Sequence, residues 1–128
     1  MNILGIDYGK SKVGLATGDS ETRMAFGYGT LENDKDLIPK LAEIVEKENI
    51  SKIIIGITSY LNHKKSPNPG EKFGNLLKDK LGIEIEYQNE MFTTRQAQAN
   101  LIEKGVKGIK KYDDREAARL ILQGWLDR

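Results

Sequence analysis

Two short apolar runs near the start of the chain are so close together in sequence that only one pairing is open to them. Residues 3–7 and 13–17 are separated by a short turn containing Gly9. Such a connection can join only antiparallel strands, because a parallel pair needs a crossover of a dozen residues or more. Asp7 therefore lies at the mouth of a β-hairpin, where a metal ion or a phosphate could meet its carboxylate. The alternative is that Asp7 only caps the turn, since Asp is common in turns.

The following segments alternate between strand and helix patterns. Residues 24–31 predict a third strand, and Gly27 and Gly29 mark it as bent or at an edge of the sheet. Helical spacing of apolar residues begins at about Asp34. The continuous β-branched run at 53–57 is typical of a central parallel strand covered on both faces.

The second half of the chain predicts three more helices and one strand. One helix covers 69–81 and stops at Gly82, with an expected buried stripe of Phe73, Leu76, Leu77 and Leu81. Residues 83–88 alternate apolar and polar side chains, which indicates a strand. The remaining helices are expected at 93–103 and from residue 113 to near the C-terminus.

With the two C-terminal helices counted together, the order of elements is β-β-β-α-β-α-β-α, which predicts an α/β fold with one domain over residues 1–128. The first three strands form a meander, and the strands at 53–57 and 83–88 run parallel to the first. Right-handed crossovers then place helices on both faces of a five-stranded mixed sheet.

Composition excludes some classes of protein but does not identify the function. The 128 residues carry 38% hydrophobic and 30% charged side chains, as expected of a globular domain, and a formal net charge of +1. The absence of cysteine excludes disulfides, thiolate zinc sites and cysteine nucleophiles. Neither a signal peptide nor an apolar run of membrane-spanning length is evident, so we expect a soluble cytoplasmic protein without membrane contact.

Three carboxylates far apart in sequence are expected to converge on one end of this fold. Asp7 and Glu90 come at the carboxyl ends of strands, and Asp114 comes at the start of the last helix. Ligands of open α/β sheets bind outside the carboxyl ends of the strands. Glu90 could instead be a solvated residue, and Asp114 could simply favour a helix N-terminus. Asp113, with Glu116 three residues later, is the better helix cap and leaves Asp114 to project from the first turn.

Basic residues occur close to these acidic positions in the predicted fold. They belong to the first hairpin, to a glycine-containing loop and to the start of the last helix: Lys10, Lys12, Lys107, Lys110, Lys111 and Arg115. Glycine permits close backbone approach to phosphates, and lysine supplies salt-sensitive attraction. A solvated surface run is the alternative. Beside an acidic cluster, the pattern favours a polyanionic substrate.

Several motifs in the right order resemble one protein family over essentially the whole chain. These are Ile6-Asp7-Tyr8-Gly9-x-x-x-Val13-Gly14-Leu15-Ala16, Ile55-Gly56-Ile57, Asn89-Glu90-x-x-Thr93-Thr94 and Asp114-x-x-Ala117-Ala118-x-x-x-Leu122-Gln123. Together they are similar to the YqgF family, whose members are described as pre-16S rRNA nucleases and as Holliday junction resolvases. The chain departs from the family pattern at Asn89, Met91 and Thr58, where Asp, Arg and Pro are usual.

The resemblance implies an RNase H-like fold and hydrolysis of nucleic-acid phosphodiesters with Mg²⁺ or Mn²⁺. Matching the family's acidic positions one at a time gives Asp7, Glu90 and Asp114 as catalytic residues and metal ligands. A pair of such ions can activate the attacking water and stabilise the leaving oxygen.

The expected substrate is structured RNA, in 5′-end maturation of pre-16S rRNA, or branched DNA, and the expected state is a monomer or a weak homodimer. A non-catalytic nucleic-acid-binding module remains an alternative. A sugar-kinase or actin-type ATPase is a further one, although ATP there lies between two domains and this chain predicts one.

Overall fold

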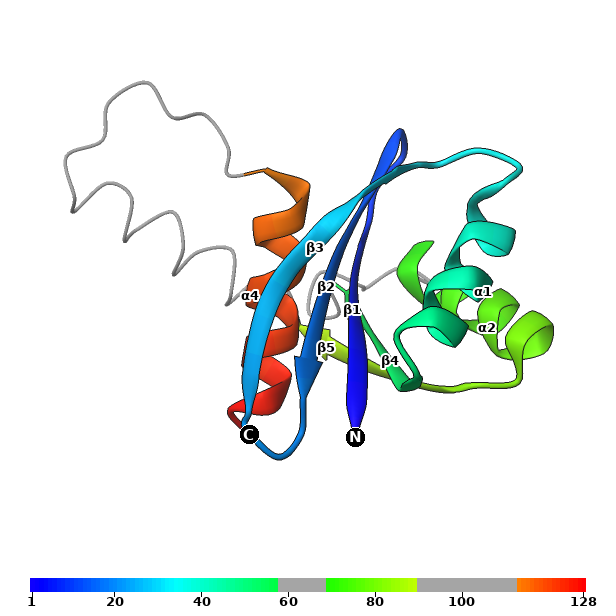
Figure 1. Ribbon diagram of the computed structural model, residues 1–128. Helices are drawn as coiled ribbons and strands as arrows, with labels where there is room; N and C mark the ends of the chain where they lie inside the picture. Colours follow the sequence, from blue (N-terminus) through cyan, green and yellow to red (C-terminus); the bar gives the residue numbers. More distant parts are fainter. Residues whose placement is uncertain (58–68, 90–112) are drawn as a thin grey trace, which may run out of the picture.

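Five strands form one mixed sheet in the order β3-β2-β1-β4-β5 (Figure 1). The computed structural model describes residues 1–57, 69–89 and 113–128. β1 (Asn2–Tyr8), β2 (Lys12–Asp19) and β3 (Met24–Glu32) are antiparallel neighbours. β4 (Ile50–Ile57) and β5 (Glu84–Asn89) run parallel to β1. The predicted meander and the predicted parallel strands are both confirmed.

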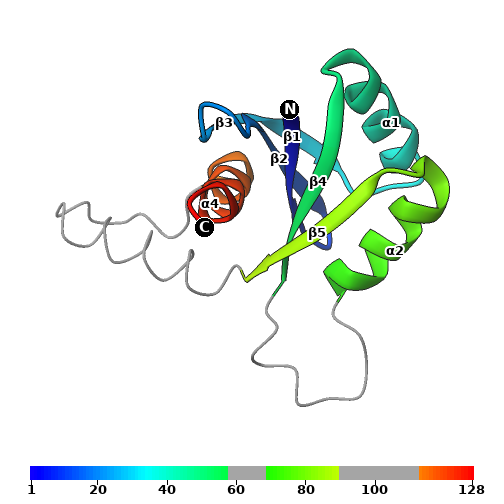
Figure 2. The same ribbon diagram turned by 90° about the horizontal axis from the view of Figure 1, so that it is seen from below.

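The helices lie on both faces of the sheet, as predicted (Figure 2). α1 (Leu37–Lys47) and α2 (Pro69–Leu81) cover one face, and α4 (Asp114–Leu126) covers the other. The helix predicted at 93–103 lies outside the described residues. None of the helices in the described ranges is long and apolar enough to cross a membrane.

The two faces of the sheet carry two separate apolar cores, and alternation along the strands decides which residue joins which. On β1, Leu4 and Ile6 pack on the side of α1 and α2, whereas Ile3 packs on the side of α4. Successive side chains of a strand point to opposite faces. The odd-numbered residues of β1 therefore face α4, and this fixes the direction of Asp7.

The edge strand β3 is bent at its glycines, as the sequence predicted. Leu15 pairs with Gly29 and the next residue, Ala16, pairs with Gly27, so Tyr28 is an extra residue on β3. One extra residue opposite a regular strand is a β-bulge, which bends and twists the bulged strand. The predicted bent edge strand is confirmed.

Two details of the predicted helices are wrong. Leu76 is 44% exposed, so it does not belong to the buried stripe of α2. The other predicted residues, Phe73, Leu77 and Leu81, do pack toward the sheet. Gly74 joins them, where a β-carbon would lie 2.3 Å from the Tyr87 hydroxyl. α1 begins at Leu37 and not at Asp34, because the Asp34 side chain accepts a hydrogen bond from the Asp36 backbone in a turn before the helix (2.9 Å).

Candidate active site

Asp7 is the next-to-last residue of β1, at the carboxyl end of the strand. Two residues earlier on the same face, a β-carbon on Gly5 would lie 2.7 Å from the β-carbon of Leu122 in α4. By alternation, the Asp7 side chain points to this α4 face. It is half-buried there, so its carboxylate lies at the margin of the core.

Asp114 is brought to the same place by a close contact between α4 and β2. A β-carbon on Gly14 would lie 1.9 Å from the carbonyl oxygen of Asp114 and 2.9 Å from its β-carbon. Gly14 is the direct cross-strand partner of Asp7. Because β-carbons of directly opposite residues are about 4.5–5.5 Å apart, those of Asp7 and Asp114 are no more than about 8.5 Å apart. The structure therefore brings together two of the three predicted carboxylates.

The start of α4 assigns different roles to two neighbouring aspartates. Asp113 is the N-cap, and its side chain accepts a hydrogen bond from the Glu116 backbone N–H at 2.8 Å. Asp114 is the first helical residue and is half-buried. The predicted assignment of the cap to Asp113 is confirmed, so the cap does not account for Asp114.

The hairpin that carries Asp7 is held by a residue that the sequence analysis missed. The Asn33 side-chain amide donates to the Gly9 carbonyl at 2.6 Å, and the Asn33 backbone N–H donates to the Ser11 carbonyl at 2.8 Å. Asn is a common turn residue that bonds to backbone groups, which is the available signal. Its partner Gly9 lies 24 residues away, however, so only the fold shows which backbone it fixes.

Tyr8 anchors the same strand end from the opposite face of the sheet. Its ring stacks on Phe73 of α2, with ring centroids 4.3 Å apart and planes inclined by 20°. Phe73 is buried in the core under α1 and α2. The backbone on both sides of Asp7 is thus fixed, by Tyr8 packing on one side and by the Asn33 hydrogen bonds on the other.

Three of the predicted basic residues lie at this end of the sheet. Lys10 and Lys12 are exposed at the hairpin, and alternation along β2 places Lys12 on the same face as Gly14. Arg115 follows Asp114 in α4, and its aliphatic chain lies across β3, where a β-carbon on Gly27 would meet its Cγ at 2.9 Å. The Arg115 side chain is 56% exposed. All three can therefore reach a ligand in solvent.

The other predicted site residues lie outside the described residues: Glu90, Lys107, Lys110 and Lys111. Within the described ranges, no group of three or more His, Cys, Asp or Glu side chains is placed to hold a metal ion. The described part of the site therefore offers the two carboxylates of Asp7 and Asp114. Oxygen donors of this kind suit hard cations such as Mg²⁺ and Mn²⁺, so the residues present fit the cation that the resemblance implies.

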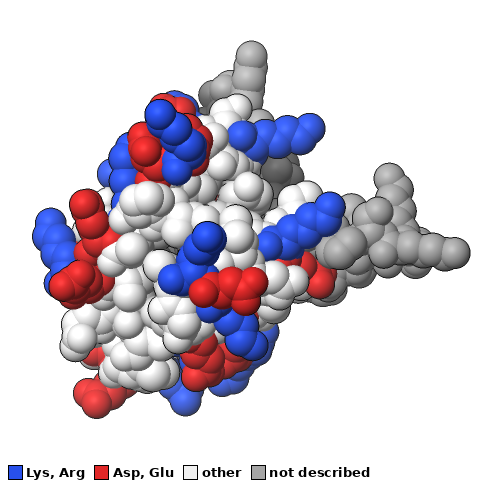
Figure 3. Space-filling model, turned by 90° about the vertical axis from the view of Figure 1, so that its right-hand side faces the viewer, with Lys and Arg blue, Asp and Glu red and all other residues white. Residues whose placement is uncertain are grey.

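The opposite layer of the molecule carries a different charge pattern. Figure 3 shows the side of α1 and α2, where Lys and Arg are interspersed with Asp and Glu and neither sign dominates. A surface of mixed sign gives little net attraction for a polyanion. The acidic pair and its basic neighbours Lys12 and Arg115 belong to the α4 layer.

Comparison with known proteins identifies the family of the chain. A family model described as "RuvX: Holliday junction resolvase" matches residues 1–128. A protein of Streptococcus suis named "Putative pre-16S rRNA nuclease" is 33% identical over 137 residues, covering 100% of this chain and 99% of the relative.

Solved structures with the same fold include two resolvases. RuvC of T. thermophilus in complex with Holliday junction substrate has a TM-score of 0.57 at 14% identity, over 98% of this chain and 93% of that one. The fowlpox virus Holliday junction resolvase has a TM-score of 0.58 at 15% identity, over 99% of both chains. These similarities confirm the predicted RNase H-like fold.

Proposed function

The chain belongs to the RuvX family, also called YqgF, and we propose that it is a nuclease that hydrolyses nucleic-acid phosphodiesters with a divalent cation. The observation that best supports this proposal is the contact of Asp114 with Gly14, directly across from Asp7. Two carboxylates whose β-carbons lie within about 8.5 Å of each other can both ligate one cation, which would remove the repulsion between them. Their placement on one face therefore favours metal binding over two independent structural roles.

In this proposal, Asp7 and Asp114 hold Mg²⁺ or Mn²⁺, and Glu90 is the third ligand. A bound cation supplies an activated water and neutralises charge on the leaving oxygen. The residues of the chain contribute fixed positions for the ligand oxygens. Asp7 lies in a strand paired on both sides, with β2 and β4, and Asp114 is fixed by the capped start of α4. Ligands held in this way need little rearrangement when the cation binds.

The proposed substrate is structured RNA, in the 5′-end maturation of pre-16S rRNA during ribosome biogenesis. The printed name of the Streptococcus suis relative, which aligns over its whole length, supports this choice. Lys10, Lys12 and Arg115 would contact phosphates beside the reacting bond. Such contacts position a backbone without reading its sequence, as expected for a nuclease that recognises the shape of an RNA.

A second candidate is cleavage of branched DNA. The description of the family model and the Holliday junction bound by T. thermophilus RuvC favour it. The two candidates share the acidic pair and differ only in the nucleic acid that the surrounding surface accepts. A direct comparison of the two substrates decides between them.

The test is to incubate the purified chain with a pre-16S rRNA 5′ fragment and with a four-way DNA junction, each with Mg²⁺, with Mn²⁺ and with EDTA. We expect metal-dependent cleavage of the RNA and none in EDTA. Asp7→Asn and Asp114→Asn should each abolish cleavage while the protein stays folded, because Asn has a similar size but no charge.

Asp113→Asn is the matched control. It removes the same charge one residue before Asp114, and Asn caps helices as well as Asp does. This variant should therefore cleave like the wild type. Full cleavage in EDTA, or full activity of Asp7→Asn, would refute the metal mechanism. Cleavage of the junction alone would replace the RNA proposal with the DNA one.

A further inference from the structure

A pocket of about 250 Å³ lies at the end of α4 that is away from Asp114. It is bounded by this helix, by β5 and by the turn that joins β2 to β3. α4 has 13 residues and is therefore roughly 20 Å long, so the pocket is separate from the proposed metal site. Its lining consists of Ser20, Arg23, Glu86, Trp125, Leu126 and Arg128.

Arg23 has an unusual backbone conformation for its residue type. In the part of the chain that the structure describes, two residues other than glycine have a positive φ, namely Arg23 at 58° and Asn49 at 54°. Asparagine adopts this left-handed conformation more readily than other side chains do, whereas arginine adopts it at a cost in stability. Such a cost persists where the side chain has a use, so the conformation of Arg23 indicates a role for its guanidinium group.

The backbone of Arg23 is held on both sides. Its N–H donates to the Asp19 carbonyl at 2.8 Å, and its carbonyl accepts a hydrogen bond from Gln123 Nε2 of α4, also at 2.8 Å. The side-chain oxygen of Gln123 accepts from the Ala25 N–H at 3.0 Å. α4 therefore fixes the position of Arg23 at the pocket. No ion pair within the described ranges uses the exposed Arg23 side chain, so its charge is available to a ligand.

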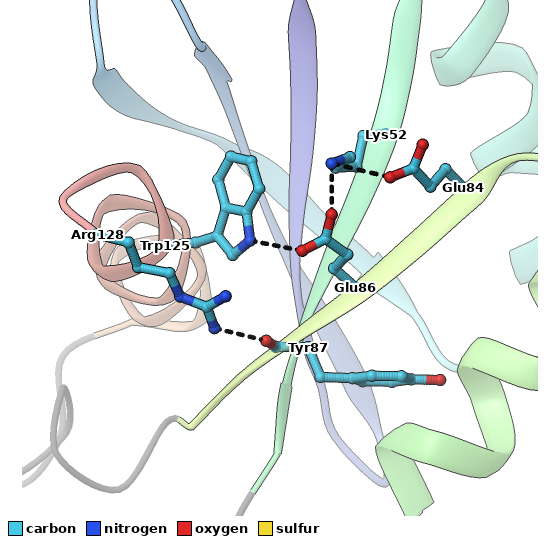
Figure 4. Close-up of polar contacts among 6 residues, drawn as sticks. All are labelled: Lys52, Glu84, Glu86, Tyr87, Trp125 and Arg128. Carbon is cyan, nitrogen blue, oxygen red and sulfur yellow. Dashed lines mark hydrogen bonds and ion pairs between the residues drawn. The ribbon is translucent and has the colours of Figure 1, made fainter.

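Arg128 brings a second guanidinium group to the pocket (Figure 4). It donates to the Tyr87 carbonyl at 2.9 Å and to Gln88 Oε1 at 2.7 and 3.1 Å. These bonds use its Nε and Nη2 atoms, and no hydrogen bond among the described residues uses Nη1. Arg128 is thus anchored to β5 and keeps donors for a ligand.

The acidic residue of the lining, Glu86, is already paired. Its carboxylate pairs with the Lys52 ammonium group and accepts a hydrogen bond from the Trp125 indole N–H at 3.1 Å (Figure 4). The bond from Lys52 lowers the pKa of Glu86, so this carboxylate is ionised at neutral pH and its charge is balanced by Lys52. The two arginines therefore leave the pocket with an excess of positive charge.

We propose that this pocket binds a backbone phosphate of the nucleic-acid substrate, roughly 20 Å from the cleaved bond, with Arg23 as its main contact. The planar fork of arginine matches the geometry of a phosphate, and the Ser20 hydroxyl is a further donor. Pockets that enclose a whole small molecule usually measure about 300–1,000 Å³, so this one suits a phosphate with part of its sugar better than a free nucleotide. The inference rests on the proposed function and adds a second contact that short substrates do not reach.

The test compares Arg23→Asn with a matched control, Lys47→Gln, which removes the same charge from an exposed residue of α1 in the opposite layer. Binding of a pre-16S rRNA 5′ fragment is measured in EDTA over a range of salt concentrations, so that no cleavage intervenes. We expect Arg23→Asn to make the slope of log affinity against log salt concentration shallower by about 0.7–0.9, the value for one phosphate contact. Lys47→Gln should leave the slope unchanged. Arg23→Asn should melt at or above the wild-type temperature, because asparagine adopts the positive φ more readily.

Arg23→Lys separates charge from geometry, because it keeps the charge but not the forked donor. It should keep the wild-type slope and recover only part of the affinity. The inference is overturned if Arg23→Asn binds the RNA with the same slope as Lys47→Gln. It is overturned equally if Arg23→Asn loses binding of adenosine 5′-monophosphate but not of RNA, since the pocket would then be a site for a free nucleotide. If the wild type neither binds nor cleaves RNA or the DNA junction, the proposed function fails first and this inference fails with it.

Discussion

Replacing Gly14 with alanine tests the central contact of the proposed site. The new β-carbon would lie 1.9 Å from the Asp114 carbonyl oxygen, and real β-carbons essentially never approach an atom closer than 3.0 Å. The start of α4 must therefore move away from β2 by at least about 1.1 Å. The obstructing atom belongs to the backbone, so no side-chain rotation can relieve the clash. Asp114 has to move with its helix.

A displacement of this size should affect activity more than folding. Misplacement of a reacting group by about 1 Å can cost about 100-fold in rate, and we expect a loss of that order in Gly14→Ala. Overpacking of a tight contact typically costs about 1–3 kcal/mol of the free energy of unfolding. The variant should remain folded at the assay temperature, with native circular dichroism.

The assay is single-turnover cleavage at saturating Mn²⁺, together with urea unfolding of each variant. Gly29→Ala is the matched control, because nothing lies within 4 Å of a β-carbon there and the strand is part of the same sheet. Gly18→Ala controls for instability. Its β-carbon would meet Met24 O at 2.9 Å and Leu122 Cδ2 at 3.0 Å, on the same strand as Gly14 but roughly 13 Å away from it.

Gly18→Ala should lose stability and keep its turnover per folded molecule, and Gly29→Ala should change neither. The reasoning is refuted if Gly14→Ala cleaves within twofold of Gly29→Ala. It is refuted equally if Gly18→Ala loses as much turnover as Gly14→Ala, because the loss would then follow packing in general and not the position of Asp114.

Three further predictions concern the Asp113 cap, the lysines of the predicted basic loop and Glu86, which pairs with Lys52. Asp113→Ala should lower the free energy of unfolding in urea by about 0.5–2 kcal/mol with a modest loss of activity. Asp114→Ala should remove activity with little loss of thermal stability. If the two effects are exchanged, the site assignment moves by one residue. Replacing Lys107, Lys110 and Lys111 with Gln should make the slope of log RNA affinity against log salt concentration shallower by about 2–3. An unchanged slope would mean that these lysines form a solvated surface. Because its folded pKa is lowered from 4.5, Glu86 contributes stability above pH 4.5 that is lost as pH falls through the folded pKa. Urea unfolding across this pH range should show that Glu86→Gln loses less stability on acidification than the wild type does. Equal losses in the two proteins would contradict this linkage.

The sequence predicts the sheet well because local rules determine most of it. The turn at Gly9 is too short for anything but antiparallel pairing, and the run at 53–57 is too apolar for an exposed strand. The start of α1 was less well predicted, because a side-chain turn at Asp34 precedes the helix. The prediction that Leu76 is buried was wrong for a tertiary reason. Tyr87 packs on Gly74, and the buried face of α2 follows that contact.

The candidate site was predictable in its residues but not in its contacts. Convergence of Asp7 and Asp114 follows from the order of elements alone, since both come at one end of the sheet. The register of α4 on β2 does not follow, and that register brings Asp114 onto Gly14. The hydrogen bonds from Trp125 to Glu86 and from Arg128 to the Tyr87 carbonyl (Figure 4) were also invisible in the sequence, because the bonded residues lie 39 and 41 positions apart.

Small residues along β2 now have a physical reason that strand propensity does not give. Gly14, Ala16 and Gly18 alternate on the face toward α4, and glycine weakens a strand because it has no side chain to pack. Here the missing side chains allow the helix to lie against the sheet, with the Asp114 carbonyl in contact with Gly14. Any larger residue at position 14 would increase the separation of Asp114 from Asp7. The glycine within the motif Val13-Gly14-Leu15-Ala16 is therefore better explained by the spacing of two carboxylates than by the stability of the strand that contains it.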